Sequence, residues 1–310
     1  GGDGFVGMVD REVFDEWLRA RAALAGAERR TGTFERIERD TDGTAVIVYT
    51  EGRGGMAHRV RARAVIGCDG ARSGVAQQAI KGARTKFVFA YHEIIKAPEA
   101  HYDFRAERCD VVYQGAISPD FYGWVFPHGE TASIGVGSAN KGFALRQSCA
   151  RLRLQSGLAG CETLRREGAP IPLKPLKRWD NGRDVVVAGD AAGVVAPASG
   201  EGIYYAMTCG AIAAQSVTAF LRTGDARALR QARKQFMRAH GRVFWVLGIM
   251  QHFWYRSDKR RERFVKMCED KDVQKLTWQA YMNKELVRAE PMAHARIFLK
   301  DMGHLLGLAH

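Results

Sequence analysis

The sequence contains few cysteines, and it arranges none of them in a metal-binding or disulfide motif. Its six cysteines include no C-x-x-C pair, which argues against a zinc ribbon or a disulfide framework and suits a reducing cytoplasm. The nine histidines show no H-x-x-x-H spacing either. We therefore expect no metal site and no structural disulfide.

Long hydrophobic runs are also missing. No segment approaches the roughly 20 apolar residues that a membrane-spanning helix needs. The longest candidate is VFWVLGIMQHFWY at residues 243–255, and Gln251 and His252 interrupt it. No secretory signal is visible. These observations predict a cytoplasmic protein that is soluble or peripheral to a membrane rather than integral.

Acidic residues are scarce toward the C-terminal end. Residues 221–310 hold nineteen Lys or Arg against nine Asp or Glu, and so carry most of the net charge of +13. Such a region can meet nucleic acid, acidic protein or an anionic membrane. No nucleic-acid reading motif accompanies the charge, so we expect no nucleic-acid partner. Lys259, Arg260, Arg261 and Arg263 are candidates for contact with lipid headgroups, and a solvated helix face is the alternative.

The 310 residues, 46% of them hydrophobic, can bury one large core or two modest ones. Periodicity and turn residues predict helices at 10–27 (with Asp10 as N-cap), 141–157 and from 204 onward, a hairpin at 34–50, and strands at 59–68, 86–97, 109–117, 122–127, 131–138 and 184–188. The apolar side of the first helix comprises Val13, Phe14, Trp17 and Leu18.

The most informative segment is GDAAGVVAPASGEGI at residues 189–203. It follows an apolar run at 185–188 and leads into a helix of small residues. Aspartate at the end of a buried strand can accept hydrogen bonds from ribityl or ribose hydroxyls, and glycines allow close backbone approach. The positive end of the next helix would stabilise negative charge on a reduced flavin. An ordinary strand–turn–helix corner is the alternative interpretation.

A second segment, RARAVIGCDGARSGV at residues 61–75, is again an apolar strand that closes on Asp69 and Gly70. As a pair, Asp69 and Asp190 are predicted to contact a cofactor, although either could be a structural cap. A third segment, GGDGFVG at 1–7, matches G-x-G-x-x-G. No strand precedes it and the next helix starts later, so we do not expect a dinucleotide-binding turn there.

Aromatic residues alternate in FYGWVFP at residues 121–127. Tyr122, Trp124 and Phe126 therefore project from one side of a predicted strand. Packing onto the core is the usual reason for such a pattern. A wall for an apolar chain is the alternative, because flat rings supply a large contact area.

These motifs together resemble a known family. The pair formed by Asp69-Gly70 and Gly189-Asp190 is similar to the motifs of flavoproteins with the p-hydroxybenzoate-hydroxylase-like fold. FYGWVFP fits the Y-x-W-x-F-P pattern of geranylgeranyl reductases, and DREVFDEWLRARA at 10–22 resembles their arginine-bearing helix. The resemblance extends over nearly the whole chain.

The resemblance implies an α/β (α+β) fold. An FAD/NAD(P)-binding three-layer domain would occupy residues 1–80 and 180–222, an antiparallel-sheet substrate domain 81–179, and a helical region 223–310. It also implies that the family's N-terminal βαβ unit, with its G-x-G-x-x-G, lies upstream of this sequence, so that the three-layer domain is truncated here.

The resemblance also implies roles for individual residues. The cofactor-binding residues would be Arg11, Asp69, Gly70, Gly189, Asp190, Gly193, Pro197, Gly200, Glu201, Gly202 and Ile203. The substrate-binding residues would be Tyr122, Trp124, Phe126 and Pro127. No catalytic acid is identified, and Tyr122 is the candidate.

The implied activity is reduction of a geranylgeranyl chain to phytyl, with FAD as cofactor and NADPH as reductant. The chain would be borne by a chlorophyll-type pigment or be present as the diphosphate, and the protein would be peripheral at the photosynthetic membrane. A flavin-dependent monooxygenase or halogenase of the same fold is the nearest alternative. A non-catalytic basic module that binds membrane or nucleic acid is the other.

Overall fold

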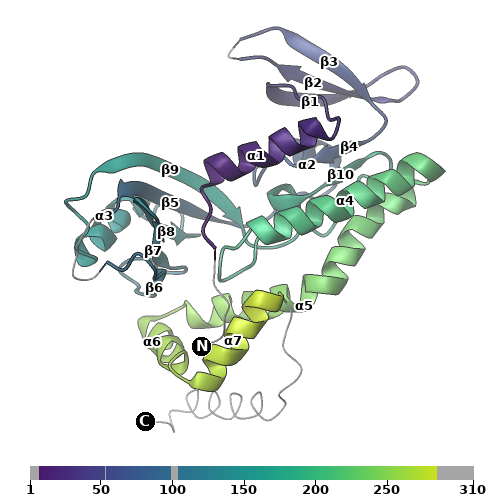
Figure 1. Cartoon of the computed structure of the whole chain (residues 1–310). Helices are drawn as coiled ribbons and strands as arrows, with labels where there is room; N and C mark the ends of the chain where they lie inside the picture. Colours follow the sequence, from purple (N-terminus) through teal and green to yellow (C-terminus); the bar gives the residue numbers. More distant parts are fainter. Residues whose placement is uncertain (1–6, 53, 99–103, 285–310) are drawn as a thin grey trace.

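The computed structural model of the chain describes residues 7–52, 54–98 and 104–284 (Figure 1). In chain order its elements are α1 (Arg11–Leu24), β1 (Thr33–Arg39), β2 (Ala45–Thr50), β3 (Ala57–Ala62), β4 (Val65–Gly67), α2 (Gly74–Ala79), β5 (Phe87–Lys96), β6 (Asp110–Val112), β7 (Gly123–His128), β8 (Thr131–Ser138), α3 (Leu145–Gln155), β9 (Thr163–Pro172), β10 (Val185–Val187), the 3₁₀ turn η1 (Gly189–Ala192), α4 (Ile203–Thr223), η2 (Ala226–Arg230), α5 (Gln231–Trp254), α6 (Asp258–Met267) and α7 (Lys271–Asn283). The G-x-G-x-x-G match at residues 2–7 lies outside the described residues except for Gly7.

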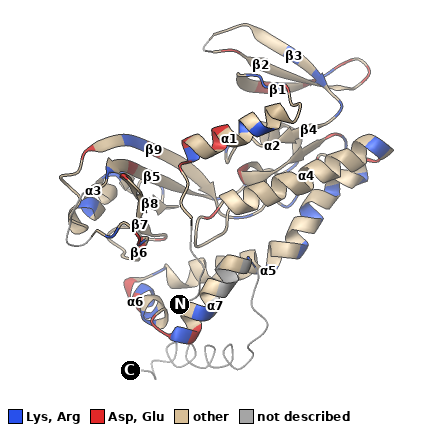
Figure 2. Ribbon diagram, in the orientation of Figure 1, with Lys and Arg blue, Asp and Glu red and all other residues tan. Residues whose placement is uncertain are grey.

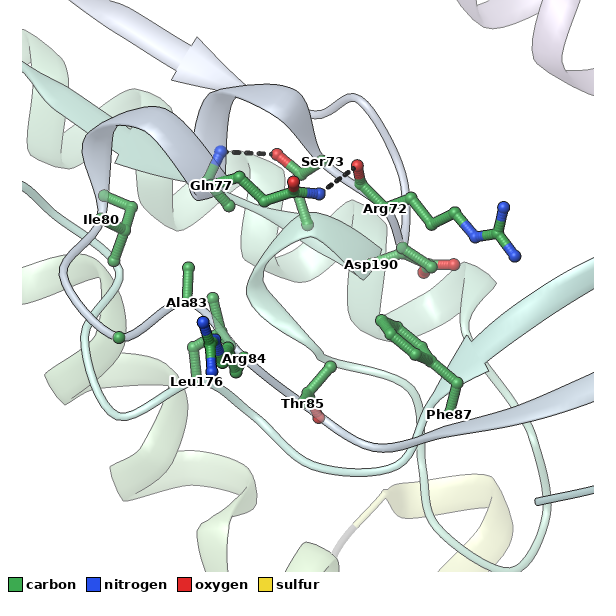
Figure 3. Close-up of a pocket in the computed structure, with 14 residues that line it drawn as sticks. Arg72, Ser73, Gln77, Ile80, Ala83, Arg84, Thr85, Phe87, Leu176 and Asp190 are labelled. Atoms are coloured by element: carbon green, nitrogen blue, oxygen red, sulfur yellow. Dashed lines mark hydrogen bonds between the residues drawn. The ribbon is translucent and has the colours of Figure 1, made fainter. Parts of the chain in front are cut away.

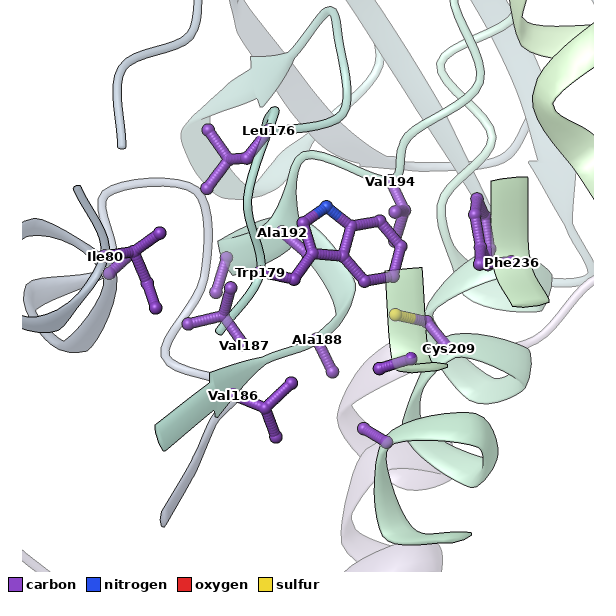
Figure 4. Close-up of a cluster of buried hydrophobic side chains, with 14 of the residues drawn as sticks. Ile80, Leu176, Trp179, Val186, Val187, Ala188, Ala192, Val194, Cys209 and Phe236 are labelled. Carbon is purple, nitrogen blue, oxygen red and sulfur yellow. The ribbon is translucent and has the colours of Figure 1, made fainter. Parts of the chain in front are cut away.

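Two short parallel strands carry the two aspartate motifs. β4 and β10 pair in parallel, with Ile66 opposite Val186, although more than a hundred residues of chain separate them. This pairing brings the chain at 185–187 back beside 65–67, and the predicted domain bounds stay a prediction. The buried core under β10 contains Trp179, Val187 and Phe236 (Figure 4). Because both strands run the same way, their carboxyl ends meet at one edge.

A five-stranded antiparallel sheet, in the order β6-β7-β8-β5-β9, forms the left-hand body of Figure 1. Helix α3 covers one face, where Cys149 and Leu152 join Val125 and Ile134 in one buried cluster. The predicted strands at 86–97, 122–127 and 131–138 are confirmed. The strand predicted at 109–117 is much shorter, because only β6 pairs with β7.

The strand predicted at 59–68 is wrong as a continuous element. β3 pairs with β2 in a separate three-stranded sheet, whereas β4 pairs with β10. The change of sheet occurs at Arg63 and Ala64, directly before Val65 donates its backbone N–H to the carbonyl of Asp184. Alternation along the sequence predicts strand geometry but does not tell which partner each half takes.

The helical predictions hold in outline. Asp10 caps α1 by accepting the N–H of Glu12, as predicted. The apolar side of α1 packs less than its pattern indicates, since Trp17 is 50% exposed and no residue of α1 is buried. In α4 and α5, Tyr205 packs against Phe244 with ring centroids 4.9 Å apart. Within the described part of the chain, no helix has the length and apolarity to span a bilayer.

Candidate functional site

Local geometry fixes Asp190 just beyond β10. Gly189 and Gly193 bound a 3₁₀ turn, and both have positive φ, 61° and 79°. A Cβ on Gly193 would lie 2.3 Å from the carbonyl oxygen of Lys174, so only glycine fits there. The turn places the Asp190 side chain beyond the carboxyl end of the strand.

The Asp190 carboxylate is half-buried, and none of the described residues donates a hydrogen bond to it. Burial raises its pKa above the ordinary value of 3.8, and the charge of Arg11 partly offsets this effect. Arg11 itself holds Asp15 at 2.7 Å. The structure therefore brings Arg11 into the electrostatic neighbourhood of Asp190, and its contact with a cofactor stays a prediction.

Asp69 has a different environment. Its carboxylate accepts hydrogen bonds from the hydroxyl of Ser73 and, at 3.0 Å, from the N–H of Val75. Gly70 follows with a φ of 83°. Asp69 thus orders the start of α2, as a structural cap would. Its contact with a cofactor stays a prediction.

A cavity of about 600 Å³ opens between the two motifs (Figure 3). Asp190 and Arg72 lie toward one end of it, and Ile80 and Leu176 toward the other. Arg72 and Arg84 supply positive charge to the lining. Such a lining suits an elongated ligand with both polar and apolar parts.

The segment 196–203 leads from the Asp190 turn into α4, and we call it the cofactor loop because the resemblance assigns it to the cofactor. It is closed by the N–H of Ala196 donating to the carbonyl of Glu201 at 2.8 Å. It contains Pro197, Gly200 and Gly202, and it ends at the first residue of α4, Ile203. α4 has no side-chain cap and no acidic residue in its first turn. Its first N–H groups are therefore available to an anionic group.

Three aromatic side chains line one face of the sheet beside the cofactor loop, and we call them the aromatic face. Tyr122 and Trp124 have ring centroids 6.0 Å apart, and Trp124 and Phe126 have centroids 6.3 Å apart. This arrangement confirms that the three project from the same side. Pro127 is buried and alternates onto the opposite face, so it does not share this surface.

The aromatic face touches the cofactor loop directly. The hydroxyl of Tyr122 donates to the carbonyl of Ser199. A Cβ on Gly200 would lie 3.2 Å from that hydroxyl oxygen. The Tyr122 hydroxyl is thereby engaged with the backbone, and its role as a proton donor stays a prediction.

A polar network in contact with the indole of Trp124 was not predicted from the sequence. The indole N–H donates to Ser133 Oγ at 3.1 Å, which also contacts His92 Nδ1 at 3.0 Å, and His92 Nε2 lies 3.1 Å from Glu167. Gly135 leaves room for the indole, since a Cβ there would lie 2.2 Å from Trp124. Burial lowers the pKa of His92, and Glu167 partly opposes this shift. The network fixes the orientation of Trp124.

The residues around Asp190 fit a flavin cofactor. An unpartnered carboxylate can accept hydrogen bonds from hydroxyls, glycines allow close approach, and the uncapped start of α4 suits an electron-rich ring edge. Together with the parallel strands, these features define an FAD-binding flavoprotein. Residues 5–135 match the family model described as FAD binding domain, and residues 139–302 match that of lycopene cyclase protein.

The chain belongs to the geranylgeranyl reductase family. It is 54% identical to the geranylgeranyl diphosphate reductase of Rhodobacter capsulatus, over 99% of this chain and 78% of that protein. Among solved structures, a geranylgeranyl bacteriochlorophyll reductase-like protein from Thermoplasma acidophilum gives a TM-score of 0.70 at 23% identity, over 81% of this chain and 66% of that one. The flavin-dependent halogenase CmlS gives 0.60 at 18% identity, over 86% and 54%. The two structural matches establish the fold.

Proposed function

We propose that this chain acts as an FAD-dependent reductase that saturates double bonds of a geranylgeranyl chain to give phytyl, with NADPH as the reductant. The geranylgeranyl group is attached to a chlorophyll or bacteriochlorophyll pigment or is present as the free diphosphate. The observation that carries the proposal is the contact between Tyr122 of the aromatic face and Ser199 of the cofactor loop. This contact supports the proposal because it joins the aromatic face to the segment that would hold the flavin.

The chemistry of the substrate explains why such a surface is needed. Each reacting bond is a trisubstituted alkene without a carbonyl to activate it, so a hydride at one carbon must be matched by a proton at the other. Asp190 would hold the flavin, which once reduced would supply the hydride. Trp124 and Phe126 orient the alkene and exclude water from it. Their ring faces also stabilise positive charge that develops as the proton is added.

The test uses the protein with FAD and NADPH under anaerobic conditions, and offers geranylgeranyl diphosphate or geranylgeranyl-bacteriochlorophyll. Mass gains in steps of two hydrogens, matched by NADPH consumption, are the expected result. A flavin-dependent monooxygenase would instead leave the chain unreduced and add an oxygen atom once air is admitted. That outcome would overturn the proposal in favour of the nearest alternative.

In the same assay, Trp124→Ala is expected to lower kcat/KM for the prenyl substrate by about 30-fold. Loss of roughly 80 Å² of apolar contact corresponds to about 2 kcal/mol. FAD affinity should change little, because the indole bonds to Ser133 rather than to the cofactor loop. Trp245→Ala on α5, where the side chain is 69% exposed, is the matched control. Equal effects of the two replacements on the diphosphate substrate would contradict the role of the aromatic face.

We propose in addition that α5 contacts an anionic membrane, such as the photosynthetic membrane. Lys234, Arg238, Arg242, Trp245 and Ile249 are all exposed and recur at helical spacing, and we call them the α5 outer face. The sequence of α5 contains no Asp or Glu, and Figure 2 shows its basic residues along the helix. Basic residues beside an exposed Trp are typical of helices that lie at a membrane interface.

Combined Arg238→Ala and Arg242→Ala replacement is expected to weaken binding to vesicles containing phosphatidylglycerol by about 30-fold. Each cation near an anionic surface contributes about 1 kcal/mol. Sedimentation with the vesicles measures the change, and added salt should weaken wild-type binding in the same way. Trp17→Ala, which removes an exposed Trp from α1, is the control and should have little effect. Equal binding to neutral phosphatidylcholine vesicles would count against the proposal.

A further inference from the structure

The cofactor loop contains a backbone conformation that its sequence disfavours. Ala198 has a φ of 65°, and it is one of two described residues other than glycine with positive φ. A Cβ in this left-handed region crowds the following carbonyl, so alanine rarely adopts it unless its surroundings enforce it. Ala198 is also buried. Something must hold it there.

The end of α5 supplies both contacts that hold Ala198. The N–H of Ala198 donates to Gln251 Oε1 at 3.3 Å, and the carbonyl of Ala198 accepts from Tyr255 Oη at 3.0 Å. Gln251 and Tyr255 are four residues apart, so they project from the same side of the helix end. One helix end thus binds the donor and the acceptor of the strained residue.

Tyr255 is itself rigidly placed. Its ring packs near Tyr113, Phe121 and Phe264, at centroid distances of 5.3, 6.3 and 6.4 Å. Its backbone carbonyl accepts from the buried Arg261 guanidinium at 2.5 Å. Burial raises the pKa of Tyr255 well above its ordinary value, so the hydroxyl keeps its proton and remains a donor.

We propose that Gln251 and Tyr255 are positioning residues that hold the cofactor loop in its flavin-binding form. Tyr122 fixes the next carbonyl, at Ser199, from the substrate side, so the loop is held between the aromatic face and the helical region. The C-terminal helices therefore serve the flavin site, which lies on elements far earlier in the chain. This inference rests on the proposed flavin-dependent function.

The test measures amide hydrogen exchange of residues 196–203 in the FAD-free protein, and FAD affinity by titration. Tyr255→Phe keeps the ring but removes the hydrogen bond, and we expect loop exchange to rise and FAD affinity to fall, each about fivefold. Tyr49→Phe on β2 is the matched control, because it also removes a phenol hydroxyl but its ring packs against His58 and has no contact with Ala198 or Tyr255. It should leave both measurements unchanged.

Ala198→Gly distinguishes positioning from general packing. Glycine adopts positive φ freely, so in an Ala198→Gly background the Tyr255→Phe effect on both measurements should shrink to less than twofold. Unchanged loop exchange in Tyr255→Phe, or an equal increase in the two backgrounds, overturns the inference.

Absence of FAD binding by the unmodified protein would instead overturn the proposed function. Amide hydrogen exchange in the single and double variants would still decide whether α5 positions the loop.

Discussion

Replacement of Asp190 by alanine is expected to lower FAD affinity by about 30-fold while leaving the flavin-free protein at least as stable as the parent. Hydrogen bonds to a charged group contribute about 1.5–3 kcal/mol, which brackets this loss. The carboxylate has no hydrogen-bond donor among the described residues, so its removal breaks no bond of that part of the fold. It also relieves the cost of burying an unpartnered charge.

The effect of pH on stability has a definite sign. Because burial raises the pKa of Asp190 in the folded state, the cost of its charge is present above that raised pKa and disappears below the ordinary value of 3.8. The stability gain of Asp190→Ala should therefore be largest at neutral pH and should shrink as the pH falls toward 3.8. Thermal unfolding of the flavin-free proteins across this range measures it.

Asp190→Asn is the matched control for charge, since its amide oxygen still accepts a hydrogen bond. We expect it to retain part of the FAD affinity. Asp69→Ala provides a contrast, because Asp69 bonds to Ser73 and Val75 and its loss should mainly destabilise α2, by about 1 kcal/mol. Full FAD affinity in Asp190→Ala would show that the carboxylate does not hold the cofactor.

Local signals in the sequence predicted the local parts of this site. The run 185–188 followed by Gly-Asp predicted a buried strand and a glycine-rich turn, and β10 and η1 occupy those positions. Alternation predicted that Tyr122, Trp124 and Phe126 share a face, because strand geometry fixes this without reference to partners. β8 likewise spans the predicted 131–138.

Features that depend on pairing between distant strands could not be predicted. The network in contact with Trp124 joins Ser133, His92 and Glu167, which lie on three strands and meet only through the register of the sheet. The division of 59–68 into β3 and β4 depends on β10, which comes much later in the chain. The left-handed Ala198 had no signal at all, because glycine is the residue that marks positive φ.

Replacement of Arg153 by methionine is expected to lower the free energy of unfolding by about 3–5 kcal/mol. Arg153 lies in α3 and is only 8% exposed, and its guanidinium donates to Glu93 on β5 at 2.5 Å. It also bonds to Thr163 at 2.7 Å and to the carbonyl of Cys161 at 2.5 Å. Methionine keeps much of the volume but leaves Glu93 as a buried charge without its main partner.

The pH dependence of this loss follows from Glu93. Burial acts to raise its pKa, but hydrogen bonds from Tyr91 and Arg153, together with the charges of Arg153 and Arg166, bring it below the ordinary value of 4.5. A lowered folded-state pKa gives stability that is fully present above 4.5 and is lost as the pH falls through the folded-state value. The difference between parent and variant should therefore be large at neutral pH and should narrow in acid.

Denaturant unfolding of four variants, the two single replacements, their combination and a control, separates the charge pair from general packing. Arg151→Met, on the exposed side of the same helix, should change stability by less than about 0.5 kcal/mol. Glu93→Gln combined with Arg153→Met should cost less than the sum of the single replacements, because the second removes the charge that the first leaves unpaired. Additive losses would mean that the two side chains stabilise the sheet independently. Since this pair ties α3 to the side of the sheet opposite Trp124, a non-additive loss would show that the two charges hold that helix on the sheet as one unit.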